Sequence, residues 1–297
     1  MREIRKILCP MDLSDVSRHA IGHAALLARW YNARITALHV WNPAVISSTD
    51  FAFVGSPSAV AFDGGEMKEI SRQLGRCLAA SGAADAEILV QSGRPANQIL
   101  ECAAAVPADL IVMGTHGAGG FEHLVLGSVA EKVLRKATCP VMTVPPRARA
   151  TSRLPFRRIL CPVDFSEPSV AALEFAFSLA QEGDAELTIL HVFEWAEGDP
   201  LVTRAFSVPE YVQQLERDAM KKLDEIVPEG IRNWCRPATR VAHGKAYREI
   251  LGIATEDNAD VIVMGVHGRN AFDLMLFGST TNHVVRGATC PVLTLRQ

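Results

Sequence analysis

The chain has 297 residues, which is long enough for two domains of ordinary size with a hydrophobic core each. Hydrophobic residues make up 48% and charged residues 21%, as in soluble globular proteins, and no apolar run approaches the roughly 18 residues of a membrane span. A formal net charge of -3 gives the whole chain no attraction to nucleic acid or anionic membranes, so an anion site has to be local.

The seven cysteines are an odd number and contain no C-x-x-C pair, which argues against a disulfide framework and a zinc site. The first residues, MREIRKILCPMD, hold too short an apolar run for a signal peptide. We therefore expect a cytoplasmic protein. Four cysteines occupy apolar settings, where we expect small buried side chains. They are Cys9 and Cys161 in ILCP, and Cys139 and Cys290 in ATCPV.

The two halves of the chain repeat one another almost without gaps. Gly114 and Gly265 are 151 residues apart, and so are Cys139 and Cys290. A repeat of that length indicates a duplicated domain, because solenoid repeats are far shorter. We predict one domain at 1–146, a linker rich in Pro, Ser and Arg at 147–156, and a second domain at 157–297.

Strand and helix patterns alternate through each half. The strands are expected at 6–12, 33–41, 87–91, 110–113 and 141–144, and at 158–164, 185–193, 239–242, 261–264 and 292–295. Branched, nearly continuous apolar strands that alternate with helices predict parallel sheets. The expected fold is therefore α/β, with two tandem doubly wound domains, each a five-stranded parallel sheet with helices on both faces and right-handed crossovers.

An acidic residue follows the first strand of each half, Asp12 or Asp164, and a serine follows it as the expected helix cap, Ser14 or Ser166. The aspartates have two interpretations. They cap the loop, or they meet the sugar or metal of a ligand, because open parallel sheets bind ligands at the carboxyl ends of their strands.

The second strand of each half ends in His-Val. His39 and His191 lie beside branched residues, and we expect them on the strand face with satisfied hydrogen bonds. After this strand, the first half has a longer segment rich in Pro, Ser, Gly and Phe, at 43–65. A lid over a ligand and a mobile surface loop are both open interpretations of it.

A glycine pattern follows the fourth strand of each half. Gly114 ends the strand, Gly117 comes three residues later, and Gly127-Ser128 opens a helical segment. A strand, a glycine loop and a helix start bind phosphate well, because backbone N–H groups can approach an anion there. The alternative is a tight turn followed by a capping box of Ser128 and Glu131. The pattern is not a P-loop, because Gly119 is followed by Gly120 and Phe121 where a P-loop needs Lys and Ser or Thr. It is not a dinucleotide fingerprint either, because Glu122 stands in the place of the third glycine.

The segments ILCPMD, HVW, VMGTHG, LGSVAEKV and ATCPVMTV, each matched in the second half, resemble those of the universal stress protein family. The resemblance covers nearly the whole chain, so the chain resembles a tandem member of the ATP-binding branch. It implies Rossmann-like domains of the adenine nucleotide alpha hydrolase-like kind. It also implies that ATP, with or without Mg²⁺, lies in the crevice between the first and fourth strands.

The ATP-binding branch carries the motif G-x-x-G-x9-G-[ST], and both halves of the chain contain it. The resemblance implies that Asp12 and Asp164 meet the ribose, and that Val40 and Val192 meet the adenine edge through their backbone. The residues that match the motif are Gly114, Gly117, Gly127 and Ser128 in the first half, and Gly265, Gly268, Gly278 and Ser279 in the second.

The function we expect is regulatory binding of an adenine nucleotide under stress, with at most weak ATP hydrolysis, because the loops offer no P-loop lysine. His116 and His267, between the paired glycines, are candidates for a base or for a donor to phosphate. We assign no catalytic residue and no metal ligand. Two other classes stay open: an ATPase or adenylyl-transferring enzyme, and a module that binds an apolar ligand or a partner through Phe51, Phe53 and Phe62, with the nucleotide structural.

The last strand of each half, 141–144 or 292–295, is an apolar sheet edge of a kind that invites pairing. Related single-domain proteins dimerise through this strand, so the resemblance implies that the two halves dock as a covalent pseudo-dimer. A further homodimer and an unidentified protein partner stay open. Nucleic acid is not expected as a partner, since no aromatic residues interleave with the linker arginines.

Overall fold

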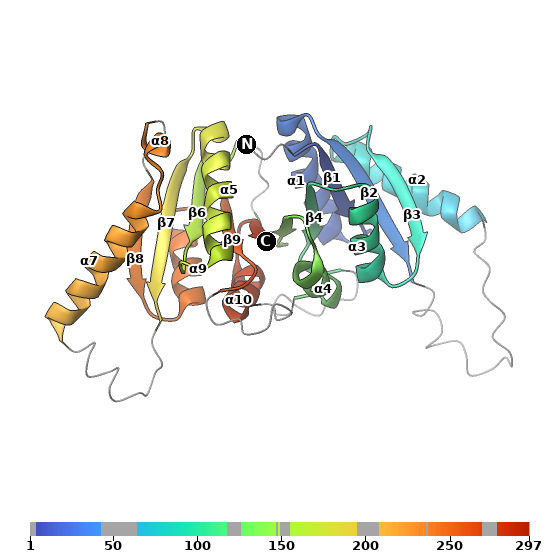
Figure 1. Ribbon diagram of the computed structural model, residues 1–297. Helices are drawn as coiled ribbons and strands as arrows, with labels where there is room; N and C mark the ends of the chain where they lie inside the picture. The colour runs from blue at the N-terminus through green and yellow to red at the C-terminus, as the bar shows by residue number, and fades with distance from the viewer. Residues whose placement is uncertain are drawn as a thin grey trace, which may run out of the picture. The chain divides into compact units, whose positions relative to one another are not determined.

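The computed structural model describes residues 4–42, 64–117, 126–146, 148, 155–194, 208–233, 235, 237–268 and 278–296 (Figure 1). The chain forms two compact units. One unit is Glu3–Pro146, and the other is Arg147–Gln297 together with the first two residues of the chain. Among the described residues, no helix is long and apolar enough to cross a membrane.

The first unit is a parallel sheet of five strands in the order β3-β2-β1-β4-β5. The strands are β1 (Lys6–Pro10), β2 (Arg34–Trp41), β3 (Glu87–Ser92), β4 (Leu110–Gly114) and β5 (Val141–Val144). The helices are α1 (Asp15–Tyr31), α2 (Gly64–Ala80), α3 (Pro95–Ala105) and α4 (Ser128–Lys136). Helices α3 and α4 contact each other on one face of the sheet, and α1 covers the opposite face (Figure 1).

The second unit repeats this arrangement in the order β8-β7-β6-β9-β10. Its strands are β6 (Arg158–Pro162), β7 (Glu186–Phe193), β8 (Ala238–His243), β9 (Val261–Gly265) and β10 (Val292–Leu295). Its helices are α5 (Glu167–Gly183), α7 (Pro209–Glu225), α8 (Glu229–Arg232), α9 (Ala246–Glu256) and α10 (Ser279–Gly287). The predicted tandem doubly wound α/β fold with parallel sheets is confirmed.

The strand order decides where a ligand can bind. In each unit the chain moves outward from the first strand in one direction and returns to build the fourth and fifth strands on its other side. The order therefore reverses between β1 and β4, and between β6 and β9. In open parallel sheets the loops part at such a switch point and leave a crevice at the carboxyl ends of the strands.

Helix α1 shows how the sequence specifies these units. Ser14 is its N-cap and accepts a hydrogen bond from the Ser17 N–H, and Asn32 ends the helix in the left-handed conformation. The buried face includes Ile21 and Leu27, at 0% and 2% exposure. Each such side chain contributes roughly 1.5–3 kcal/mol on burial. The helix therefore packs firmly beside β1 and β4, which carry the candidate site.

The apolar stripes of α2 and α7 are only partly buried by the described residues. Leu78 and Leu223, in the C-terminal halves, are 1% and 0% exposed, whereas Met67 and Tyr211, in the N-terminal halves, are 37% and 46% exposed. The N-terminal turns of both helices therefore contribute less to the core than their C-terminal halves. Residues 64 and 65, predicted as loop, open α2.

Candidate functional site

Asp12 follows β1 and Asp164 follows β6, at the switch point of each unit. The Ser14 N–H donates to Asp12 Oδ1 at 3.1 Å, and the Ser166 N–H donates to Asp164 Oδ1 at 3.0 Å. Both serine hydroxyls donate to the same oxygens. One oxygen of each carboxylate therefore caps the loop, as the first interpretation of these aspartates proposed.

The second oxygen of each aspartate faces the glycine loop. A methyl group placed on Gly268 would lie 2.5 Å from Asp164 Oδ2, and one placed on Gly117 would meet Asp12 Oδ2 just as closely. Any side chain at these glycines would have to displace the carboxylate. The loop after the fourth strand therefore passes directly over the aspartate after the first strand, so the structure brings these predicted site residues together in both units.

The strand-end glycines have a packing role. A methyl group on Gly114 would lie 2.7 Å from Val16 Cγ1, and one on Gly265 would lie 2.9 Å from the backbone of Pro168. These contacts belong to the first turns of α1 and α5. Gly114 and Gly265 thus allow each helix to start close against the end of the fourth strand.

Helices α4 and α10 begin without a side-chain cap from the described residues. Their N-caps are Gly127 and Gly278, so Ser128 and Ser279 are the first helical residues. The alternative of a capping box is therefore wrong. The cap position is glycine because the backbone is tight there: the Gly127 N–H donates to the Thr115 carbonyl at 2.9 Å, and a methyl group on Gly127 would lie 3.1 Å from the same oxygen.

The second unit has the same helix start. The Gly278 N–H donates to the Val266 carbonyl at 3.2 Å, and a methyl group on Gly278 would lie 3.0 Å from that oxygen. In both units the helix start is thus fixed to the loop that passes over the aspartate. A helix start carries unpaired N–H donors and the positive end of the helix dipole, and is therefore suited to an anion.

The loop histidines differ between the units. His116 shares a hydrogen bond of 2.8 Å between its Nδ1 and the Thr115 hydroxyl. Val266 takes the place of Thr115 in the second unit, so His267 has no hydroxyl beside it in the sequence. His267 is buried, at 5% exposure. Both histidines lie where the chain leaves the fourth strand, and their role as base or phosphate donor stays a prediction.

The strand histidines have the satisfied hydrogen bonds predicted for them. His39 Nδ1 donates to the Met11 carbonyl and His191 Nδ1 donates to the Val163 carbonyl, both at 2.8 Å. A carbonyl can only accept, so Nδ1 carries the proton in both rings. These bonds fix the end of the second strand to the residue before the aspartate. Val40 and Val192, the next residues, therefore lie at the same edge as Asp12 and Asp164.

A row of aromatic rings at the second unit was not predicted. Phe165 lies 4.7 Å from His191, His191 lies 5.0 Å from Phe193, and Phe193 stacks on His243 at 5.4 Å, measured between ring centroids. His243 Nε2 and Glu216 Oε1 are 2.7 Å apart. The row crosses the carboxyl ends of β7 and β8. The first unit keeps a ring at two of these positions, His39 and Trp41, and has Leu13 and Ser92 at the other two.

A signal for this row was present in the sequence. The repeat places Leu13 opposite Phe165 and Ser92 opposite His243, so a comparison of the halves shows aromatic gains in the second one. Their proximity depends on which strands are neighbours. Residues ending β7 and β8 pair in register, and Phe193 is opposite His243.

The four cysteines predicted as packing residues are free thiols. Cys9 and Cys161 are fully buried. Burial raises the pKa of the Cys9 thiol to about 12 and raises the pKa of Cys161 further. Burial also raises the pKa of Cys139 to about 11 and that of Cys290 to about 12. These thiols stay protonated at neutral pH. The described part of the chain holds no group of three or more His, Cys, Asp or Glu suited to a metal ion.

Residues 43–63 of the segment interpreted as a lid or surface loop, with Phe51, Phe53 and Phe62, lie outside the described residues. The middle of each glycine loop, 118–125 and 269–277, also lies outside them. The described part still defines a class of protein: two tandem doubly wound α/β domains, each with a glycine loop that passes over an aspartate at its switch point. The comparisons with known proteins agree with this class.

A model of the universal stress protein family matches residues 3–145 and 155–296, and the chain therefore belongs to this family. A universal stress protein from Mycolicibacterium smegmatis is 27% identical over 98% of this chain and 96% of its own length. The crystal structure of a universal stress protein from Archaeoglobus fulgidus covers 98% of both chains, with a TM-score of 0.67 and 24% identity. For a universal stress protein solved in complex with cAMP, the match covers 48% of this chain and 98% of that protein, with 25% identity and a TM-score of 0.37.

Proposed function

We propose that each domain binds ATP in the crevice at its switch point and that the chain acts as a nucleotide-dependent regulatory module in the stress response. One observation carries this proposal. In both units the glycine loop lies against the aspartate of the first strand, beside a helix start that has a glycine N-cap. A packing role explains a single glycine, but these three features together bring backbone donors and a carboxylate to one place.

In this arrangement the phosphates lie against the backbone of Gly117, Gly127 and Ser128, and in the second unit against that of Gly268, Gly278 and Ser279. The helix dipole and unpaired N–H groups supply the positive potential. The Oδ2 side of Asp12 or Asp164 accepts from ribose hydroxyls. Val40 and Val192 meet the adenine edge with their backbone groups. Mg²⁺, if bound, is held mainly by the phosphates, which is common for this ion.

The role is regulatory because the described residues offer little for phosphoryl transfer. Efficient transfer needs cations on the γ-phosphate and a base that positions the nucleophile. His116 and His267 are the repeated candidates for a base, and the motif has no lysine in the P-loop position. We expect turnover to be weak at most, and we expect the protein to act in the cytoplasm through changes in nucleotide occupancy.

The test is to replace crevice glycines by alanine, because a single methyl group is enough to clash. Calorimetry on the full chain should count two ATP sites. Gly117→Ala and Gly268→Ala should each remove one site, and the double variant should remove both. Mass analysis of nucleotide released from the purified protein identifies the natural ligand.

Gly22→Ala and Gly252→Ala are the matched controls. A methyl group at either position meets no atom within 4 Å. Both glycines lie inside helices, so alanine should preserve both sites and stabilise the fold by roughly 0.5–1 kcal/mol. Failure of the unmodified chain to bind ATP, or equal loss of binding in the control variants, would contradict the proposal.

A further inference from the structure

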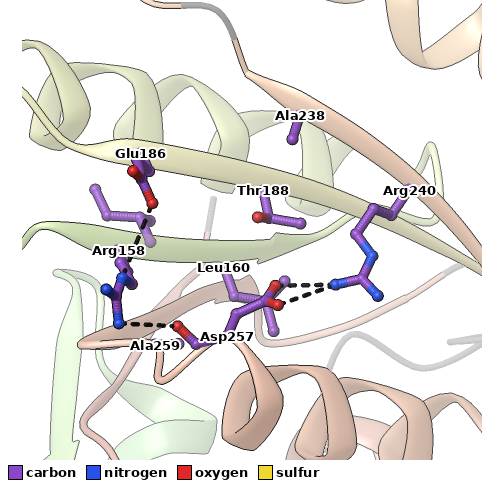
Figure 2. Close-up of a pocket in the computed structure, with 9 residues that line it drawn as sticks. Arg158, Leu160, Glu186, Thr188, Ala238, Arg240, Asp257 and Ala259 are labelled. Carbon is purple, nitrogen blue, oxygen red and sulfur yellow. Dashed lines mark hydrogen bonds and ion pairs between the residues drawn. The ribbon is translucent and has the colours of Figure 1, made fainter.

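A pocket of about 310 Å³ lies at the N-terminal ends of β6, β7 and β8, on the edge of the second sheet opposite to the nucleotide crevice (Figure 2). Nothing in the proposed nucleotide function uses this edge. Residues from three neighbouring strands and the C-terminal cap of α9 line it. The principal ones are Arg158, Leu160, Thr188, Ala238, Arg240 and Asp257.

The strand pairing explains why these side chains meet. Leu160 pairs in register with Thr188, and Thr188 pairs with Ala238. Side chains two residues apart share a face of a strand, so Arg158 and Arg240 lie on the same face as these three. Helix α9 ends at Glu256, where Asp257 begins the turn that leads into β9. Asp257 therefore stands at the rim of the pocket, beside Arg240 (Figure 2).

The first unit has a carboxylate at this place. Thr36 pairs with Glu87, as Thr188 pairs with Ala238. The Thr36 hydroxyl donates to Glu87 Oε2 at 3.4 Å. In the second unit the same position is Ala238, whose side chain is only a methyl group. The space that corresponds to the Glu87 side chain is therefore part of the pocket. Both units therefore have the threonine donor, Thr36 or Thr188, but only the first unit has the acceptor carboxylate, Glu87, at this position.

The second unit also gains positive groups around this space. Arg240 stands where the first unit has Leu89, which follows from the matched pairings of Leu190 with Arg240 and Leu38 with Leu89. A single nitrogen of Arg240, Nη1, contacts both oxygens of Asp257, at 3.1 and 3.0 Å. Its other terminal nitrogen, Nη2, lies 4.0 Å from Glu256 Oε2, so both acids hold the guanidinium in place.

Arg158 supplies the second guanidinium. Its Nη1 donates to the Asp257 carbonyl at 3.4 Å, and its Nε lies 3.9 Å from Glu186 Oε2. The Glu186 side chain is 86% exposed, and an ion pair of that length in solvent is weak. Arg158 can therefore turn toward a ligand at little cost. Three acids, Glu186, Glu256 and Asp257, surround the two arginines, so the site has no surplus positive charge for a dianion such as phosphate.

We propose that this pocket binds a small aliphatic monocarboxylate. The ligand carboxylate takes the place that Glu87 occupies in the first unit, where it accepts from the Thr188 hydroxyl and from the guanidinium of Arg158. Hydrogen bonds from a cation to a carboxylate are about twice as strong as neutral ones. The short chain lies along Ala238 and Ala259, over the buried side chain of Leu160.

The test uses hexanoate as the probe and the full chain with labelled methyl groups. Hexanoate should cause saturable chemical-shift changes at Thr188 and Ala259. Three controls at equal concentration should cause no such changes. Hexan-1-ol tests binding of the aliphatic chain alone, hexylamine tests the sign of the charge, and inorganic phosphate tests general anion binding. An absent response to hexanoate, or an equal response to any control, would overturn the proposal.

Two variants test the residues. Ala238→Glu places a tethered carboxylate beside Thr188, as in the first unit, and should weaken hexanoate about tenfold or more. Thr188→Val keeps the shape of the side chain but removes the donor, and should also weaken hexanoate. Glu87→Ala in the first unit is the matched control, because it lies outside the pocket, and it should leave the hexanoate response at Thr188 and Ala259 unchanged. Unchanged hexanoate affinity in both Ala238→Glu and Thr188→Val would contradict the assignment, and ATP binding should be unchanged in all three variants.

Discussion

The two oxygens of each switch-point aspartate have different surroundings. In Asp12 and Asp164 the Oδ1 atom accepts from the following Ser-containing turn, and the Oδ2 atom faces the glycine loop. The two interpretations drawn from the sequence, loop capping and contact with a ligand, can therefore both apply to the same aspartate. An amide can replace the first function but lacks the charge needed for the second.

Replacing Asp164 by Asn separates these functions. Asn Oδ1 can still accept from the Ser166 N–H, so the free energy of unfolding should change by less than about 1 kcal/mol. ATP affinity at the second site should fall about tenfold, because hydrogen bonds to a charged acceptor are stronger by roughly 1 kcal/mol or more. Calorimetry and thermal unfolding measure the two effects. A large loss of stability with unchanged affinity would show that the carboxylate is structural.

The buried thiols make stability depend on alkaline pH. Burial raises the pKa of the Cys9 thiol from 9.0 to about 12. The unfolded chain loses this proton near pH 9 while the folded chain keeps it, so the free energy of unfolding should fall as the pH rises from about 9 to about 12. The slope is on the order of 1 kcal/mol per pH unit for each such thiol. Urea unfolding across this range measures it, and Cys9→Ala should reduce the slope; an identical slope in the variant would contradict the assignment.

At the scale of elements, the helices that open the crevice start on glycine. Gly127 and Gly278 are N-caps because their N–H groups bond to the carbonyls of Thr115 and Val266. The first helical residues, Ser128 and Ser279, are therefore adjacent to the proposed phosphates. A negative charge placed there should act oppositely on the helix and on the ligand.

Replacing Ser128 or Ser279 by Asp should stabilise the fold by roughly 0.3–1 kcal/mol, since an acidic residue in the first turn interacts favourably with the helix dipole. The same charge should repel the phosphates and weaken ATP at that site by at least about tenfold. Ser→Asn, which is similar in shape to Asp and uncharged, is the control. Thermal unfolding and calorimetry on the same samples give both readouts, and a rise in stability with unchanged ATP affinity would show that no phosphate binds at this helix.

Helices and strands were predicted correctly where residues close in the sequence determine them. The bounds of β5 and β10 and the cap of α1 at Ser14 were predicted correctly, because short branched runs and a serine cap are local signals. The four-residue helix α8 was missed, since one turn has no period to detect. The capping box was wrong because Gly127 bonds to a carbonyl 12 residues earlier in the chain, at Thr115, which local patterns do not reveal.

The candidate site was predictable only in part, for the same reason. The motif and the repeat are enough to predict that Asp12 and Gly117 lie at the same edge of a sheet. Their direct approach, the packing of Gly114 against Val16, and the row of aromatic rings depend on distances between strands. The pocket at the opposite edge depends on the pairing of Ala238 with Thr188, which only the register of the sheet gives.

At the scale of the whole molecule, docking of the two halves through their last strands stays a prediction. In the second unit the Ile262 N–H donates to the Pro291 carbonyl and the Val266 N–H donates to the Leu295 carbonyl. Alternate residues of a parallel strand bond to the same neighbour. Thr294 therefore directs its N–H away from β9, toward the side where a further strand would pair.

Thr294→Pro tests this prediction without removing a bond to β9. Proline is tolerated at a strand edge but cannot donate to a neighbouring strand. If β10 docks as predicted, the variant should broaden the distribution of distances between the halves in solution scattering, while each domain keeps its own thermal transition. Thr294→Val, which keeps the N–H group and the branched shape, is the control. Identical scattering from the proline and valine variants would indicate that this edge does not hold the halves together.

The burial of Cys9 and Cys161 has a consequence for redox chemistry. Peroxide oxidises the thiolate, and a thiol with a pKa near 12 is thiolate in only about one molecule in 100,000 at pH 7. The strands that lead to the two switch-point aspartates therefore carry, near their ends, sulfur atoms that oxidants scarcely attack. A member of a stress protein family built in this way should keep both crevices intact during oxidative stress, when cysteines exposed on other proteins are converted to sulfenic acid.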